Sequence, residues 1–286
     1  MIGAGETITD DKKNYAYVAA EEKKGGKLRP DALASRVVVL YEKYLDRVMD
    51  VDGPAIDSLI SEADQKELEK TAYYLKLAYF KNVRAAILKS ASCKKCPYCY
   101  QLKATEVDHY LPKSKFGEYA VYAPNLVPIC RICNGKKLNK YVRPGGGRRF
   151  LHPYFDRLPA QPARYLTAEV SVGDSVLINF DVVRPVGMPE EIWIIHLNQF
   201  TELDLATRYT EDAIEYINGM LLSLRNNLST GGGAHVAKQL RIEQASRERL
   251  YGLNHWWPVM LDALAASKVF CDGGFNVLDP SGTVGV

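Results

Sequence analysis

The sequence lacks a long hydrophobic run. No window of about 18 uncharged apolar residues occurs among its 286 residues, so no transmembrane helix is expected. The first residues, Met-Ile-Gly-Ala-Gly-Glu-Thr, have neither the basic nor the apolar stretch of a secretory signal. We therefore expect a cytoplasmic protein that does not associate with membranes. Internal repeats and long low-complexity tracts are also missing, and 47% hydrophobic and 25% charged residues are typical of a globular chain with one large domain or two ordinary ones.

Cysteine is scarce, but its spacing is informative. Four of the six cysteines form two CxxC pairs with 30 residues between them, and in the cytosol such pairs are more often metal ligands than disulfides. We interpret them as the ligands of one structural zinc ion: Cys96, Cys99, Cys130 and Cys133. Cys93 and Cys96 form a further CxxC, but Pro97 and Tyr98 favour a tight turn between Cys96 and Cys99. Cys271 is distant, and we expect it to be a small buried residue.

The positive charge is concentrated in the segment that contains these pairs. Residues 94–149 have twelve Lys or Arg against three Asp or Glu, a net charge of +9, whereas the whole chain carries +3 and the remainder therefore −6. This asymmetry indicates a polyanionic partner, although a solvated basic surface gives the same count. The glycines of Gly145–Arg149 do not precede Gly-Lys-Ser/Thr, so this basic loop is not a nucleotide-binding P-loop.

Polar residues with metal-binding and acid–base chemistry lie between and just after the cysteine pairs. Four sulfur ligands leave a zinc ion no open position, so catalysis here needs a second metal with oxygen ligands. Asp108 offers a carboxylate and Asn134 an amide oxygen, which suits Mg²⁺ or Mn²⁺. On a strand, His109 would point to the side opposite Asp108, and a neutral imidazole accepts a proton from water near pH 7. A lone histidine is more often structural, but Asn125 and Asn134 nearby favour a catalytic role.

Three segments carry a resemblance to a known family: Val107–Lys115, Asn125–Cys130 and Cys133–Lys137. Together they resemble the HNH endonucleases of the ββα-metal type, over about residues 93–141. The resemblance implies that His109 is the general base, that Asn125 braces its loop, and that Asp108 and Asn134 hold one divalent metal on the scissile phosphate of DNA. Asn134 stands where many members have histidine, which makes this chain an H-N-N variant.

The resemblance also implies contacts with the nucleic-acid backbone that need no sequence readout. The basic residues expected to make them are Lys113, Lys115, Lys136, Lys137, Arg148 and Arg149. His152, just beyond the module, is expected to be structural. The whole chain more weakly resembles HNH proteins that work beside an ATPase in anti-phage defence, such as the Septu type. The alternatives are a non-catalytic zinc module that binds nucleic acid or a protein, and an effector that is silent until an ATPase engages it. RNA also remains open as a substrate.

We expect an α+β fold in which a small zinc-stapled ββα module is embedded between helical regions. The expected parts are an N-terminal helical region (1–91), the nuclease module (92–158) and a C-terminal region with a hairpin and then helices (159–286). Apolar spacing predicts helices over 31–50, 61–91, 202–226, 235–250 and 256–268, after a loose polar lead-in over 1–28. Tyr73, Tyr74 and Tyr79 are expected in the core rather than stacked on bases.

Overall fold

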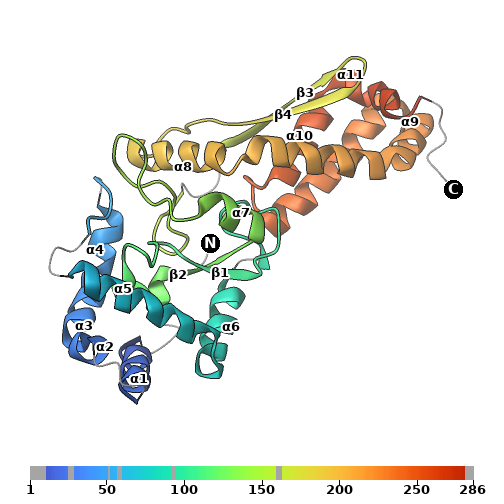
Figure 1. The fold of residues 1–286 in the computed structure, drawn as a ribbon. Helices are drawn as coiled ribbons and strands as arrows, with labels where there is room; N and C mark the ends of the chain where they lie inside the picture. Colours follow the sequence, from blue (N-terminus) through green and yellow to red (C-terminus); the bar gives the residue numbers. More distant parts are fainter. Residues whose placement is uncertain are drawn as a thin grey trace. The chain divides into compact units, whose positions relative to one another are not determined.

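The computed structural model in Figure 1 describes residues 11–24, 29–50, 52–56, 60–91, 94–158 and 163–280. The chain forms two compact units: unit 1 spans Met1–Arg157 and Ile194–Leu203, and unit 2 spans Leu158–Trp193 and Asp204–Val286. Helices dominate and the sheets are small, which confirms the α+β class. Among the described residues, no helix combines the length and the apolarity needed to cross a membrane.

The N-terminal part of unit 1 is helical, but its helices are shorter than predicted. The predicted lead-in contains a helix, because Tyr15 and Val18 are buried in the core; residues 1–10 and 25–28 of that lead-in, like Cys93, lie outside the described residues. The helix predicted over 61–91 begins as expected, with the Asp64 N–H donating to Ser61 Oγ at 3.1 Å, but Leu77 is extended and interrupts it. The elements are α1 (Asp11–Lys24), α2 (Arg29–Ala32), α3 (Ala34–Glu42), α4 (Tyr44–Met49), α5 (Glu62–Lys70), η1 (Thr71–Lys76), η2 (Ala78–Phe80) and α6 (Lys81–Ser90).

Two short strands and a helix follow. Strand β1 (Glu106–His109) pairs antiparallel with β2 (Leu126–Ile129), so that His109 lies opposite Leu126 and Asp108 opposite Val127. Helix α7 (Arg131–Lys137) begins directly after β2, and α6 packs against both strands. The connection between the strands contains η4 (Gly117–Tyr119) and η5 (Ala123–Asn125). This ββα arrangement places the ends of β1 and α7 beside each other.

The N-terminal helices share one core with this ββα segment. The buried Glu118 carboxylate pairs with Arg47 of α4 at 2.9 Å, and the Tyr119 hydroxyl donates to the Leu40 carbonyl at 3.0 Å. The predicted division between residues 91 and 92 is therefore not a boundary between compact units. Tyr73 and Tyr79 differ from the prediction, since 60% and 42% of their surfaces are exposed.

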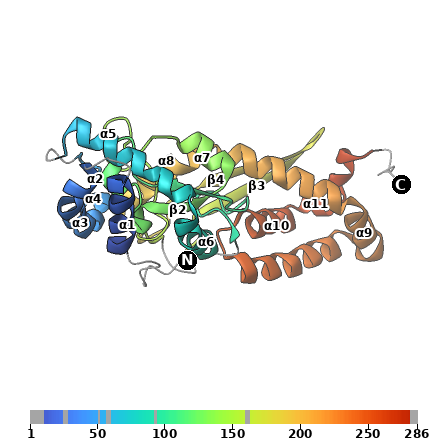
Figure 2. The same ribbon diagram turned by 60° about the horizontal axis from the view of Figure 1, so that its bottom comes forward.

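Unit 2 combines a hairpin with a bent helix. Strands β3 (Leu166–Val172) and β4 (Val176–Val182) pair antiparallel, as their alternating pattern predicted. The backbone of Gly231 and Gly232 is non-helical, and the long helix doubles back there, as Figure 2 shows. Its two arms lie side by side, joined by a hydrogen bond from Tyr216 to Glu243. The helices are α8 (Glu190–Glu202, whose C-terminal part belongs to unit 1), α9 (Leu205–Tyr251), α10 (Trp256–Ala266), α11 (Lys268–Cys271) and η6 (Gly274–Leu278).

Candidate functional site

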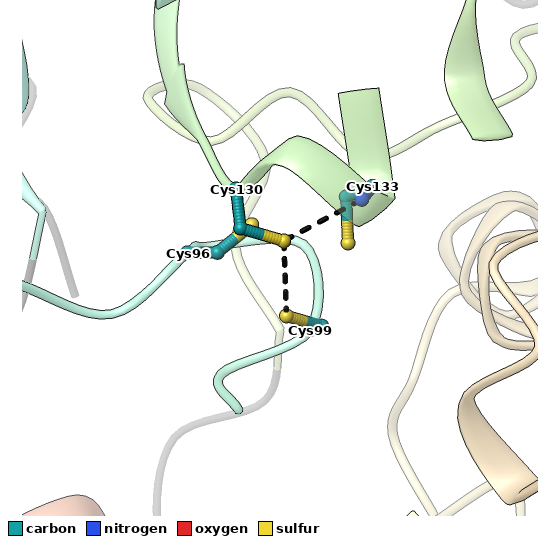
Figure 3. Close-up of side chains that lie close together, drawn as sticks. All are labelled: Cys96, Cys99, Cys130 and Cys133. Atoms are coloured by element: carbon teal, nitrogen blue, oxygen red, sulfur yellow. Dashed lines mark hydrogen bonds between the residues drawn. The ribbon is translucent and has the colours of Figure 1, made fainter. Parts of the chain in front are cut away.

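The four predicted zinc ligands come together in unit 1. Their sulfur atoms all lie within 4.8 Å of one another, and all four side chains are buried. Figure 3 shows two of them on the loop before β1 and two at the start of α7, with the sulfurs facing a common centre. The Cys130 sulfur caps α7 by accepting from the Cys133 N–H at 3.4 Å and lies 3.9 Å from the Cys99 sulfur.

The donor set and its spacing fit a zinc ion. A tetrahedral site with Zn–S bonds of about 2.3 Å has sulfurs about 3.8 Å apart, close to the Cys99–Cys130 separation. Hydrogen bonds among the four thiols lower the pKa of Cys99 and Cys130, whereas burial raises the pKa of Cys96. Such an ion would join the loop before β1 to α7 and so fix both segments relative to each other.

The His109 ring is held in one orientation. Its Nε2 lies 2.8 Å from the Ala120 carbonyl oxygen, which only accepts, so Nε2 carries the hydrogen and Nδ1 keeps its lone pair. Burial lowers the pKa of His109 below its ordinary value of 6.5. The ring is therefore neutral near pH 7, with Nδ1 available as a proton acceptor.

Asn125 holds the two segments that flank His109. Its side chain is fully buried, accepts from the Leu111 N–H at 2.8 Å, and donates to the carbonyls of Leu111 at 3.1 Å and Tyr119 at 3.3 Å. Leu111 lies two residues after His109, and Tyr119 precedes the Ala120 carbonyl that binds the His109 ring. Asn125 therefore holds the backbone that follows His109 and the segment whose carbonyl binds the His109 ring.

Asp108 pairs with a lysine of α7. The Lys137 ammonium lies 2.8 Å from Asp108 Oδ2 and donates to the His109 carbonyl at 2.9 Å. Only 1% of the Lys137 side chain is exposed. Lys137 thus joins the end of α7 to the end of β1 and supplies a countercharge to the Asp108 carboxylate.

Asn134 also bonds to β1, through a carboxylate that the sequence reasoning missed. Its Nδ2 donates to Glu106 Oε2 at 2.8 Å. Glu106 and Asp108 are two residues apart on a strand, so both side chains point to the same side. Glu106 and Asp108 lie on β1 and Asn134 lies on α7, and carboxylate and amide oxygens are ligands that suit Mg²⁺ or Mn²⁺. The alternation of Glu106 with Asp108 was the signal available in the sequence.

The structure corrects the prediction for two of the six basic residues. Lys137 is buried against Asp108, and the buried Arg148 pairs with Asp156 at 2.8 Å, so neither side chain lies on the surface as a backbone contact requires. Arg149 is mostly buried and pairs with Glu202. Lys115 is exposed, while Lys113 and Lys136 are partly exposed. A charge count along the sequence does not distinguish surface lysines from buried ones.

Two side chains outside the predicted set complete the surroundings of Asn125. The Tyr44 hydroxyl of α4 lies 2.9 Å from Asn125 Oδ1 and 3.0 Å from His152 Nε2. His152 is 1% exposed, and burial lowers its pKa well below 6.5. Tyr44 lies within the helix predicted over 31–50 but was not predicted to contact the site.

The strand pair, the helix and the four-cysteine cluster form a ββα site. Residues 96–140 match the model of the HNH endonuclease family, so this segment is an HNH endonuclease domain, as the sequence motifs predicted.

Two curated proteins are similar to the chain. Protein ea31 of Escherichia phage lambda is 28% identical over 197 residues, which cover 64% of this chain and 65% of that protein. Septu protein PtuB of Bacillus thuringiensis is 38% identical over 60 residues, which cover 19% of this chain and 23% of that protein. The chain thus spans less than two thirds of the length of either relative. No solved structure gives a significant match.

Proposed function

We propose that the protein is an HNH endonuclease that hydrolyses phosphodiester bonds in DNA with Mg²⁺ or Mn²⁺. The observation that carries the proposal is the state of His109: its Nε2–H is bound to the Ala120 carbonyl, which leaves Nδ1 as a proton acceptor. A binding module needs the cysteines and surface lysines but has no use for a buried asparagine that fixes a neutral histidine.

Each side chain then has a role. His109 Nδ1 takes a proton from the water that attacks the phosphorus, and in-line displacement of the 3′ oxygen leaves a 5′-phosphate. Asn125 keeps the His109 ring in place, and Asp108 and Asn134 are the ligands that would hold the divalent ion. When bound, such an ion neutralises charge that develops on the phosphate and the leaving oxygen. Lys113, Lys115 and Lys136 position the nucleic-acid backbone.

We further propose that the chain is the nuclease effector of an anti-phage defence system and works with an ATPase subunit. Support comes from the similarity to the Septu protein PtuB, which is limited to 60 residues. In this arrangement the HNH domain supplies the cleavage chemistry and the ATPase supplies the signal that permits it. Assays of the chain alone and with an ATPase from the same genomic neighbourhood separate a constitutive nuclease from a regulated one.

The direct test is cleavage of plasmid, single-stranded DNA and RNA with Mn²⁺, Mg²⁺ or EDTA. His109→Ala is expected to keep its fold and zinc but to lose about 10²–10⁴-fold in cleavage rate, as removal of a general base usually does. His235→Ala in α9 of unit 2 is the matched control and should cleave at the wild-type rate. Cleavage by His109→Ala at the wild-type rate would contradict the mechanism, and cleavage of RNA alone would contradict the substrate.

A further inference from the structure

The hydroxyl of Tyr44 is enclosed between two polar side chains. It lies 2.9 Å from Asn125 Oδ1 and 3.0 Å from His152 Nε2, and the Tyr44 side chain is 1% exposed. The three residues come from α4, from the end of η5 and from the segment after the HNH domain. Two of the three, Tyr44 and His152, therefore lie outside the segment that matches the family.

The directions of these hydrogen bonds follow from the donors available. The Tyr154 N–H donates to His152 Nδ1 at 3.2 Å, so Nδ1 carries the lone pair. Burial, and then the nearby cations of Arg148 and Lys137, lower the pKa of His152 and keep the ring neutral. Its hydrogen is then on Nε2, which lies 3.0 Å from the Tyr44 oxygen and also interacts with the Pro124 carbonyl. The Tyr44 hydroxyl has two acceptors, Asn125 Oδ1 at 2.9 Å and the Pro124 carbonyl at 3.4 Å, and the shorter contact directs its hydrogen to Asn125. These contacts give one directed chain from His152 through Tyr44 to Asn125.

This chain determines how the Asn125 amide is turned. Oδ1 accepts from both Tyr44 and the Leu111 N–H, while Nδ2 donates to the carbonyls of Leu111 and Tyr119. Both ends of the Asn125 amide are thus bound. If the amide were rotated by half a turn, its NH₂ group would face the Leu111 N–H and its oxygen would face the carbonyls of Leu111 and Tyr119. The Tyr44 hydroxyl binds Asn125 from α4, whereas Leu111 and Tyr119 belong to the connection between β1 and β2.

We propose that Tyr44 is a positioning residue of the nuclease site. Its hydroxyl accepts a hydrogen bond from His152 and donates one to Asn125, and Asn125 in turn holds the His109 ring in the orientation that proton transfer requires. The effect of Tyr44 on cleavage depends on the proposed function, because it requires that His109 is the general base. Asn125 is bound to Leu111 and Tyr119, and these lie next to the backbone and to the Ala120 carbonyl that set the His109 ring. Helix α4, which lies outside the segment that matches the family, therefore contributes a positioning residue to the site.

The test compares two tyrosines that lie three residues apart. Tyr44→Phe removes the bridging hydroxyl, whereas Tyr41→Phe removes a buried hydroxyl that has no hydrogen-bond partner among the described residues. Steady-state cleavage of plasmid DNA with Mn²⁺ gives kcat and KM, and nitrogen NMR of histidine-labelled protein reports which nitrogen of His109 carries the hydrogen.

Tyr44→Phe is expected to lower kcat about 10- to 100-fold with little change in KM, because misplacement of a reacting group slows chemistry more than binding. The His109 Nε2–H signal should shift or broaden. Tyr41→Phe should leave both unchanged. Added to Asn125→Ala, Tyr44→Phe should cause no further loss of kcat, because the path through Asn125 is already broken.

A second pair of variants tests the donor. His152→Gln keeps an N–H for Tyr44 and is expected to retain most of kcat, whereas His152→Leu removes it and should lower kcat. Wild-type kcat in a folded Tyr44→Phe variant, or independent effects of Tyr44→Phe and Asn125→Ala, would overturn the proposal. If the wild-type protein cleaves no substrate, the proposed function fails, but an unchanged His109 signal in Tyr44→Phe still decides against the positioning role.

Discussion

At Glu106, one hydrogen bond decides which end of the Asn134 side chain faces away from β1. The carboxylate accepts only, so it must bind the Asn134 Nδ2–H₂ group, as it does at 2.8 Å. The Asn134 oxygen is then directed away from Glu106, where it is available to a cation. Partners that orient metal ligands in this way commonly change metal affinity 10- to 100-fold when they are removed.

We therefore predict that Glu106→Ala weakens Mn²⁺ binding about 10-fold or more, measured by electron paramagnetic resonance of the free ion. Asn134→Asp should restore most of the lost affinity in the Glu106→Ala background, because a carboxylate offers an oxygen at both positions and needs no orienting partner. Glu169→Ala, at an exposed position on β3 of unit 2, is the matched control. Equal Mn²⁺ affinity in Glu106→Ala and wild type would contradict this role for Glu106.

At the scale of elements, the structure could be predicted where the sequence contains a local motif or an alternating pattern. The resemblance carried by Val107–Lys115, Asn125–Cys130 and Cys133–Lys137 predicted the ββα segment, and alternation predicted the β3–β4 hairpin. The extended backbone at Leu77 was not predictable, since no glycine or proline marks it. Tyr44 was not recognisable either, because its partners Asn125 and His152 are 81 and 108 residues away. Contacts over such separations depend on packing that a local pattern does not contain.

The zinc cluster gives a prediction for the elements that it joins. Purified protein should contain about one zinc ion per chain, and Cys130→Ser should lose zinc and lower the melting temperature of unit 1, because the ion links α7 to the loop before β1. Cys271→Ser changes a buried cysteine of α11 in unit 2 and should retain the zinc. Metal analysis and thermal unfolding provide both measurements. A folded wild-type protein without zinc would contradict the assignment.

At the scale of the molecule, unit 1 contains three histidines that burial keeps neutral. The pKa values of His109 and His152 are lowered, and burial lowers the pKa of His196 in α8 to about 4. In the unfolded chain each of them titrates near 6.5. Between the two pKa values the unfolded state binds more protons than the folded state, so the stability of unit 1 is complete above pH 6.5 and falls as the pH decreases.

We predict that acidification from pH 7.5 to 5.5 lowers the unfolding free energy of unit 1, by about 1.4 kcal/mol for each histidine whose folded pKa lies well below 5.5. His196→Gln should remove one such contribution, so the difference between the two pH values should be smaller in the variant. Urea titrations at both pH values measure it. An equal difference in wild type and variant would show that His196 takes up no extra proton on unfolding.

In the proposed function, the Lys137 ammonium is expected to couple the binding of the divalent ion to the binding of DNA. Asp108, Glu106 and Lys137 together carry a net charge of −1, so a divalent cation alone reverses the charge of this group to +1. A phosphodiester brings it back to zero. The free energies of metal and nucleic-acid binding are therefore expected to be coupled, and thermodynamic linkage requires the coupling to be reciprocal.

In titration calorimetry, non-cleavable DNA should tighten Mn²⁺ binding by the same factor by which Mn²⁺ tightens DNA binding. Lys137→Met should reduce that factor, because it strengthens Mn²⁺ binding in the absence of DNA. The protein would then hold its catalytic ion firmly only on a substrate, which limits cleavage chemistry to the bound complex.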